Sequence, residues 1–452
     1  MKRRFVLAQA AMAAAMLGCG GSGGAGNRAG AGGHGTAGAA GMTAGAGGSG
    51  GAGGGGGMGI AGMGVAGTGI AGTGVAGAGV AGAGVAGGGG TAPSTPLDMN
   101  DVTILAPLPP STATPVLLLG TDLADDGTAL VPRALYDRLV ADGPTGKPLP
   151  TLDTAYEHLH LVAVRFDLCD RHLPGACPHA EDARLRLVFQ PLSSTASAAD
   201  VGFHAFYTVR NDEIAGAIAT LRDLATTAPP QSGALRVSPA LSAADFQPYA
   251  TKLRAFVRRY AGDARIVRLT MNALNLNFSA IAWALRGVEK HGDAFLDMTI
   301  VGGTATSESV TFTGNPGYSI TPMTDTPAGL LGALSQTKFE AADPATKHEY
   351  LQALAAVDNP LLNTAETVAC AACHVSTVVM YARTDTTAID PLTLPGHYSS
   401  TFDLGIAGGQ SAQTPTTLRA LGYLGKVPMI SQRVVNETAQ TLTEIEQRYP
   451  AP

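Results

Sequence analysis

The chain has 452 residues, of which 60 are glycine, 29 are lysine or arginine and 35 are aspartate or glutamate. Its formal net charge of −6 argues against nucleic acid or an anionic membrane surface as a partner, because both repel an acidic chain. Hydrophobic residues make up 45% of the chain, but no stretch is long and apolar enough for us to expect a membrane-spanning helix.

Residues 1–18 have the organisation of a secretory signal, with a basic head followed by a short apolar run. The segment Met16-Leu17-Gly18-Cys19 resembles the lipobox of bacterial lipoproteins, although leucine is usual where Met16 stands. The resemblance implies cleavage before Cys19 and acylation of that cysteine, which would anchor the chain to the cell envelope. The outer membrane is favoured, because Gly20 is not an acidic retention signal. An ordinary signal peptide that leaves Cys19 unused is the alternative.

Residues 19–92 form a predicted linker made almost entirely of glycine, alanine, serine, threonine and valine. A five-residue repeat of the type Gly-Val-Ala-Gly-Thr recurs between Gly59 and Ala86. Ordering so many glycines costs too much conformational entropy, and the segment has too few large apolar side chains to build a core. We therefore expect a disordered, Gly-rich N-terminal tether. A fibrous or self-associating role for the repeat is the alternative.

Residues 93–340 are expected to form a mixed α/β domain without a recognisable functional motif. Short apolar runs and apolar–polar alternation predict its strands. Apolar residues at helical spacing, as at Leu253, Phe256 and Val257, predict its helices. The expected strands are 115–119, 159–166, 184–189, a pair within 266–283, 297–300 and 310–312, and the expected helices are 132–141, 211–225 and 243–261.

Within this domain, Cys169 and Cys177 flank a turn at Pro174-Gly175. Two cysteines this close in an exported protein are expected to form a disulfide. A metal site remains the alternative, because His172 and His179 add two further zinc-ligand residues at workable spacings.

From about Ala341 helical patterns replace strand patterns, which places the expected domain boundary near residue 340. Residues 341–452 are expected to contain helices at 345–357, 364–381, 415–421 and 432–448. The predicted fold class is therefore α+β, with a disordered tether, a mixed α/β middle domain and a mainly helical C-terminal segment.

The C-terminal segment contains the sequence Cys370-Ala371-Ala372-Cys373-His374. Two cysteines separated by two residues and followed at once by histidine are the pattern that attaches haem c. The sulfurs of Cys370 and Cys373 would bond the vinyl groups at one edge of the porphyrin, and His374 would bind the iron. A local disulfide, a thioredoxin-like redox pair and half of a zinc site are the alternatives.

This segment resembles the cytochrome c family, although only the five-residue motif matches closely. The resemblance implies one covalent haem c, with His374 as the proximal iron ligand. Class I members take the distal ligand from a methionine in a later loop, which here implies Met429, ahead of the final helix. His397 is the rival distal ligand. Those members also carry a helix that runs directly into the motif, whereas Asp358-Asn359-Pro360 interrupts that helix here.

The expected function is single-electron transfer outside the cytoplasm, by an electron-transfer protein rather than an enzyme. Its partner would be an unidentified redox protein and not nucleic acid, and membrane contact would be through the lipid anchor alone. One alternative is a non-redox surface or binding lipoprotein in which Cys370 and Cys373 form a structural disulfide. Another is a haem enzyme with an open iron site, such as a peroxidase.

Overall fold

The computed structural model describes residues 95–451, except for positions 113, 142–151, 153, 170–182, 229–232, 243–246, 275–281, 293, 315–316, 323 and 406–417. The predicted signal, the predicted lipid-anchor residue Cys19 and the predicted linker lie outside the described residues. Residues 86–452 belong to one compact unit, and the boundary expected near residue 340 falls inside that unit. None of the helices within the described ranges is both long and apolar enough to cross a membrane.

An antiparallel sheet of nine described strands forms the centre of the fold, in the order β1-β2-β3-β4-β5-β6-β8-β9 with β7 also paired to β6. A separate hairpin consists of β10 and β11. The strands are β1 (Thr103–Leu105), β2 (Leu159–Leu168), β3 (Ala183–Pro191), β4 (Val201–Val209), β5 (Ile266–Leu274), β6 (Ala282–His291), β7 (Ala294–Asp297), β8 (Ser307–Gly314), β9 (Gly317–Thr321), β10 (Leu421–Leu424) and β11 (Val427–Ile430).

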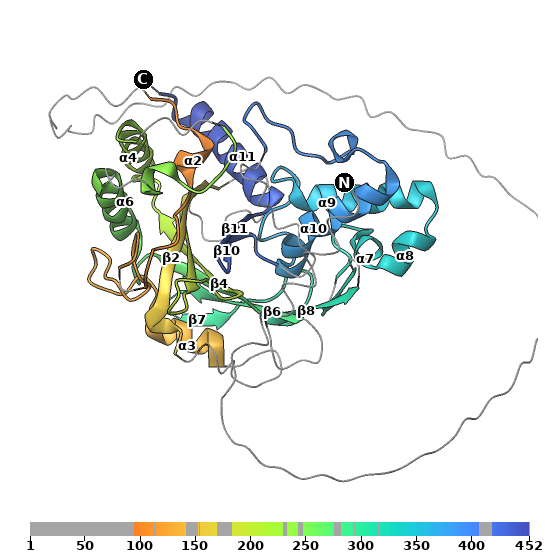
Figure 1. The fold of residues 1–452 in the computed structure, drawn as a ribbon, viewed down its shortest axis with the longest axis horizontal. Coiled ribbons are helices and arrows are strands. Elements are labelled where there is room, and N and C mark those ends of the chain that lie inside the picture. Colours follow the sequence, from red (N-terminus) through yellow and green to blue (C-terminus); the bar gives the residue numbers. More distant parts are fainter. Residues whose placement is uncertain are drawn as a thin grey trace, which may run out of the picture. The chain divides into compact units, whose positions relative to one another are not determined.

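Helices cover both faces of the sheet. Figure 1 shows α4 and α6 on one side of the strands, and α9, α10 and α11 on the other. The helices are α2 (Met99–Val102), α3 (Arg133–Ala141), η1 (Tyr156–His158), α4 (Ile214–Thr226), α5 (Pro239–Ser242), α6 (Gln247–Tyr260), α7 (Leu330–Leu334), α8 (Gln336–Ala341), α9 (Pro344–Asp358), α10 (Cys370–Thr387), η3 (Pro391–Thr393) and α11 (Gln432–Arg448).

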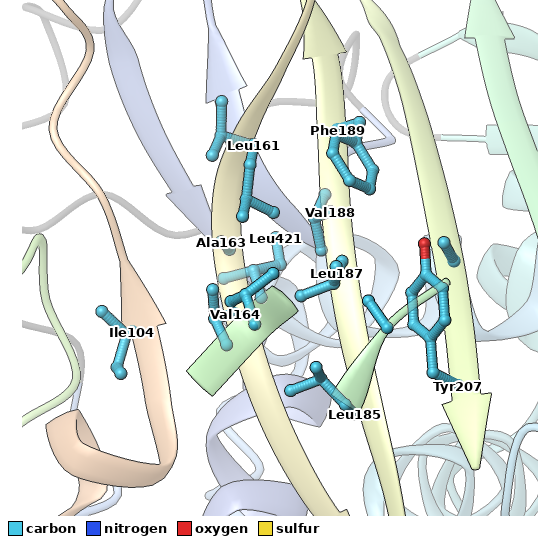
Figure 2. Close-up of a cluster of buried hydrophobic side chains, with 14 of the residues drawn as sticks. Ile104, Leu161, Ala163, Val164, Leu185, Leu187, Val188, Phe189, Tyr207 and Leu421 are labelled. Atoms are coloured by element: carbon cyan, nitrogen blue, oxygen red, sulfur yellow. The ribbon is translucent and has the colours of Figure 1, made fainter. Parts of the chain in front are cut away.

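The main hydrophobic core joins residues from both ends of the described chain. Figure 2 shows part of it, where Ile104 of β1 and Leu187 of β3 lie in one cluster with Leu421 of β10. Val434 and Leu442 of α11 belong to the same core. Each such side chain contributes about 1.5–3 kcal/mol when it leaves water, so the C-terminal elements help to stabilise the sheet.

A second hydrophobic core lies beside the first and supports the motif that contains the paired cysteines. It includes Trp283 of β6 and Val310 of β8, and Leu354 of α9 and Val379 of α10 pack in it as well. The beginning of α10 is therefore held between a sheet and another helix.

Most of the predicted elements are present, including the strands at 159–166 and 184–189 and the strand pair within 266–283. The strand expected at 115–119 is wrong, because only Leu119 makes an isolated bridge there. Two carbonyl oxygens of this segment accept hydrogen bonds from a side chain instead of a neighbouring strand. The Arg254 guanidinium donates to the carbonyl oxygens of Val116 (2.7 Å) and Leu117 (2.9 Å). Strand β4, which the sequence analysis did not predict, occupies the middle of the sheet.

The expectation of a mainly helical, cytochrome c-like C-terminal segment is not supported. Helices α9, α10 and α11 are present, but the described part of the helix expected at 415–421 is not helical and leads into the β10–β11 hairpin. Gly425 at the hairpin turn has φ +60°, a conformation that glycine adopts without strain. Leu421 and Ile430 are 1% and 2% exposed, so burial in the main core favours the hairpin over an isolated helix.

Candidate functional site

The paired cysteines lie in the first turn of α10. Cys370 and Cys373 are three residues apart and therefore share one face of the helix. Glu308 of β8 reaches the start of this helix, where its Oε2 accepts a hydrogen bond from the Ala371 amide at 3.0 Å. The Glu308 side chain is fully buried. A carboxyl from the sheet thus satisfies an amide that the helix itself leaves unpaired, and it holds the motif against β8.

Both cysteine thiols are free in the structure. Burial raises the pKa of Cys370 to about 12, with a further contribution from the nearby Glu308. Burial also raises the pKa of Cys373 to about 12. Both thiols therefore stay protonated near neutral pH, which disfavours the reactive thiolate that a thioredoxin-like pair requires.

The His374 imidazole has a defined tautomer. Its Nδ1 lies 2.6 Å from the carbonyl oxygen of Leu418 and 3.0 Å from the Nδ2 of Asn272. Asn272 Nδ2 itself donates to the Leu418 carbonyl at 2.5 Å. Two lone pairs would repel at 2.6 Å, so Nδ1 must carry the proton and donate to Leu418. The Nε2 of His374 therefore keeps its lone pair.

The carbonyl that receives this hydrogen bond is held in place by a buried ion pair. Arg419 follows Leu418 directly, is 1% exposed and pairs with Asp200 at 2.8 Å. The indole Nε1 of Trp283 donates to the other oxygen of Asp200 at 3.0 Å. This support matches the outer hydrogen bonding that orients metal-binding histidines, in which the second ring nitrogen donates to a carbonyl or carboxylate.

Burial lowers the pKa of His374 to about 4, and the positive charge of Arg419 acts in the same direction. The imidazole is therefore neutral at physiological pH. A neutral imidazole with Nε2 unprotonated is the form that binds metal ions. Within the described ranges, however, no three histidine, cysteine, aspartate or glutamate side chains are placed to hold a metal ion together.

His374, Cys370 and Cys373 line one cavity between the sheet and the C-terminal elements. The space between its walls is about 770 Å³ with the open mouth included, and about 100 Å³ of this is wide enough for the centre of a water molecule. His204 and Phe206 of β4 form part of its floor. At about 100 Å³ this interior is smaller than the roughly 300–1,000 Å³ of most small-molecule sites.

Four arginines also line this cavity, and Glu437 is the carboxylate among its described lining residues. Arg165, Arg186 and Arg268 lie in one row across the sheet with Phe206. The strand register places Arg165 of β2 opposite Arg186 of β3, which lies opposite Phe206 of β4. Phe206 in turn lies opposite Arg268 of β5. The guanidinium carbons of Arg186 and Arg268 lie 4.8 and 5.4 Å from the centre of the Phe206 ring, which is cation–π distance. The four arginines are Arg165, Arg186, Arg268 and Arg433.

Glu437 of α11 connects these arginines. It lies 2.5 Å from Arg165 Nη1, 2.6 Å from Arg433 Nε and 3.7 Å from Arg186 Nη1. Burial alone would raise the pKa of Glu437, but the three guanidiniums hold it well below its usual value. Among the described residues, the buried Nε of Arg186 has no hydrogen-bond partner. The arginine wall therefore retains a donor for an acidic ligand.

The other predicted site residues do not line this cavity. Met429 lies on β11 opposite Gly422 and is buried. His397 follows Gly396, whose carbonyl accepts from Asn359 at 2.9 Å. Cys169 is disulfide-bonded, whereas Cys177, its expected partner, lies outside the described residues, as do His172 and His179.

Sequence reasoning missed the residues that surround the motif, namely His204, Asn272, Glu308 and the arginine wall. One signal was available for the arginines. Arg184 and Arg186 alternate with leucines on a predicted strand, and the alternation indicates a charged face without showing that helices cover it. The strand that contains His204 was not predicted at all.

A scan against protein-family models and searches of curated proteins and of solved structures returned no match. Similarity therefore identifies no family for this chain. The chemistry of the site has to be inferred from the residues around His374.

These residues fit a covalently attached haem in three respects. Two protonated thiols lie on one helical face, a neutral imidazole adjoins them with Nε2 unprotonated, and the same cavity has an arginine wall for the two carboxylates of a haem. The narrow part of the cavity would have to widen to admit the ring. Cys370, Cys373 and His374 would hold the group, and Arg186 offers an unpaired donor to its carboxylates.

Proposed function

We propose that this chain is a c-type haem protein that transfers single electrons outside the cytoplasm. The observation that carries the proposal is the hydrogen bond from His374 Nδ1 to the Leu418 carbonyl at 2.6 Å. It leaves Nε2 as the ligand atom in a cavity that also contains both thiols.

Cys370 and Cys373 would each form one thioether. In each case the S–H adds across a vinyl C=C bond, so that sulfur bonds one carbon and the hydrogen goes to the other, with no net oxidation. The addition requires two free thiols, and both Cys370 and Cys373 are free in the structure. When bound, haem c supplies one-electron redox chemistry at its iron.

The arginine wall supports the same proposal. A buried carboxylate is stabilised by charge-assisted hydrogen bonds from guanidinium groups. The Nε of Arg186 has no partner within the described part of the chain, and Arg268 lies at cation–π distance from the same phenyl ring, that of Phe206. These residues would bind the haem carboxylates and orient the ring.

The signal and the lipobox resemblance support a location of this function in the cell envelope. Acylation at Cys19 would anchor the chain, with the outer membrane favoured, and the residues 19–92 would separate the folded part from the lipid. The electron partner would be another protein of that compartment.

The test expresses the full chain together with a cytochrome c maturation apparatus. We expect a covalent haem by pyridine haemochrome spectrum and a mass increase of one haem. Changing both Cys370 and Cys373 to alanine should abolish covalent attachment, and His374→Ala should reduce haem incorporation severely. Asp385→Asn, an exposed change near the other end of α10, is the matched control and should load haem normally.

A different result would contradict the proposal. If the mature chain carries no haem and its mass shows Cys370 bonded to Cys373, the non-redox lipoprotein with a structural disulfide is the correct interpretation. The two outcomes differ by the mass of one haem, so they cannot be confused.

A further inference from the structure

The cavity that contains His374 has a second histidine. His204 lies on β4 between Val188 of β3 and Thr270 of β5. It shares a face of the strand with Phe206, two residues on, and both line the cavity. His204 is thus on the sheet side of a cavity whose helix side carries the haem motif.

The Nε2 atom of His204 is buried and, among the described residues, has no hydrogen-bond partner. Buried polar atoms are nearly always paired, and an exception requires an explanation such as a missing ligand. Burial holds the pKa of His204 well below its usual value, and the charge of Arg186 acts in the same direction. The imidazole is therefore neutral and has one nitrogen lone pair to offer.

We propose that His204 and His374 together would hold the haem iron. This inference rests on the proposed function and assigns the iron a ligand that the motif alone does not identify. The unpaired Nε2 of a neutral imidazole, in the cavity that holds the proximal histidine and both thiols, is what carries it.

The rival ligands are less well placed. Met429 and His397 lie outside this cavity, as described above. Met298 lines the cavity, but its thioether packs against the strand at Gly287, where a Cβ would lie 3.0 Å from the sulfur. Met298 therefore fills the space beside the sheet.

Two imidazole ligands have functional consequences. They would leave the iron no open position, which favours electron transfer over binding of peroxide or small gases. A methionine ligand raises the potential of a c-type haem, so an iron with two histidines should have the lower potential of the two arrangements.

The experiment compares the full-length, haem-loaded protein with His204→Ala by absorption and electron paramagnetic resonance spectroscopy. We expect the unsubstituted ferric protein to be low-spin and to lack the absorption band of methionine ligation. His204→Ala should convert it to a high-spin form, and added imidazole should restore the low-spin spectrum. His204→Met should stay low-spin with a higher midpoint potential. If the His204→Ala variant does not accumulate, this rise in potential tests the ligand assignment in its place.

Three controls make the result specific. His158→Ala removes an exposed histidine that does not line the cavity and should leave the spectrum unchanged. Met429→Leu and His397→Ala should also leave it unchanged. A low-spin spectrum that survives His204→Ala, or one lost in either rival variant, overturns this ligand assignment while the proposed function stands. Absence of covalent haem from the unsubstituted chain overturns both.

Discussion

At the scale of single residues, Glu308 of β8 contacts the start of α10, the helix that contains Cys370 and Cys373. Its Oε2 accepts from the Ala371 amide, while its Oε1 is buried without a partner among the described residues. Burial raises the pKa of Glu308 from 4.5 to about 7, although the amides of Ala371 and Cys370 oppose the rise. The folded chain therefore binds this proton more tightly than the unfolded chain does.

This linkage predicts a pH-dependent difference between the chain and Glu308→Gln. Since the folded pKa is raised, ionising Glu308 costs the folded state stability as pH rises from about 4.5 to beyond 7. A rise from 4.5 to about 7 corresponds to roughly 3 kcal/mol. Urea unfolding of the chain, expressed without a haem-attachment apparatus, should therefore show Glu308→Gln gaining stability relative to the parent chain between pH 5 and pH 9.

The exposed Glu349 on α9 provides the matched control for this measurement. Glu349→Gln should change the free energy of unfolding by a similar small amount at both pH values. If Glu308→Gln also changed the free energy of unfolding by the same amount at both pH values, Glu308 would be ionised in the folded state throughout this range.

At the scale of elements, α11 determines whether the arginine wall is buried. Arg433, near its start, donates to the carbonyl oxygens of Val357 and Asn363, each at 2.6 Å, besides pairing with Glu437. It therefore ties α11 to the end of α9 and to the loop that leads into the motif. Arg448, at the other end of the helix, pairs with Glu444 at 3.8 Å and is far more accessible.

We expect Arg433→Met and Arg448→Met to differ strongly in their effect on the free energy of unfolding. The first change leaves two carbonyls unpaired and removes a buried partner of Glu437, which should cost about 3 kcal/mol or more. The second removes a partly exposed i,i+4 pair and should cost less than about 1 kcal/mol. Denaturant unfolding measures both, and equal effects would mean that Arg433 is not the tie described here.

At the scale of the whole molecule, the described elements on either side of residue 340 share one core. Leu421, Val434 and Leu442 pack in the same cluster as the strands β1 to β4. The arginines of β2, β3 and β5 face carboxylates carried by α11 and by the loop before α10, as in the pair of Arg184 with Glu366 at 2.7 Å. Neither the sheet face nor α11 would be satisfied without the other.

Thermal unfolding should therefore show a single cooperative transition for residues 93–452. The calorimetric and van't Hoff enthalpies should agree, because no part of the shared core can unfold alone. Scanning calorimetry of the chain expressed without a haem-attachment apparatus checks this expectation. Two separate transitions, one for residues 93–340 and one for 341–452, would instead favour the domain division that the change of sequence pattern predicts.

Local sequence was sufficient for the features that depend on near neighbours. The spacing of Cys370, Cys373 and His374, the helix that ends in Arg448 and the strand beginning at Leu159 all follow from patterns of a few residues. Only tertiary structure placed His204 beside the motif, selected the hairpin at Gly425 and buried the arginine row. The reason is physical: alternation along a strand shows that one face is polar, but the helix that covers this face comes from 272 positions further along the chain, as in the pair of Arg165 with Glu437.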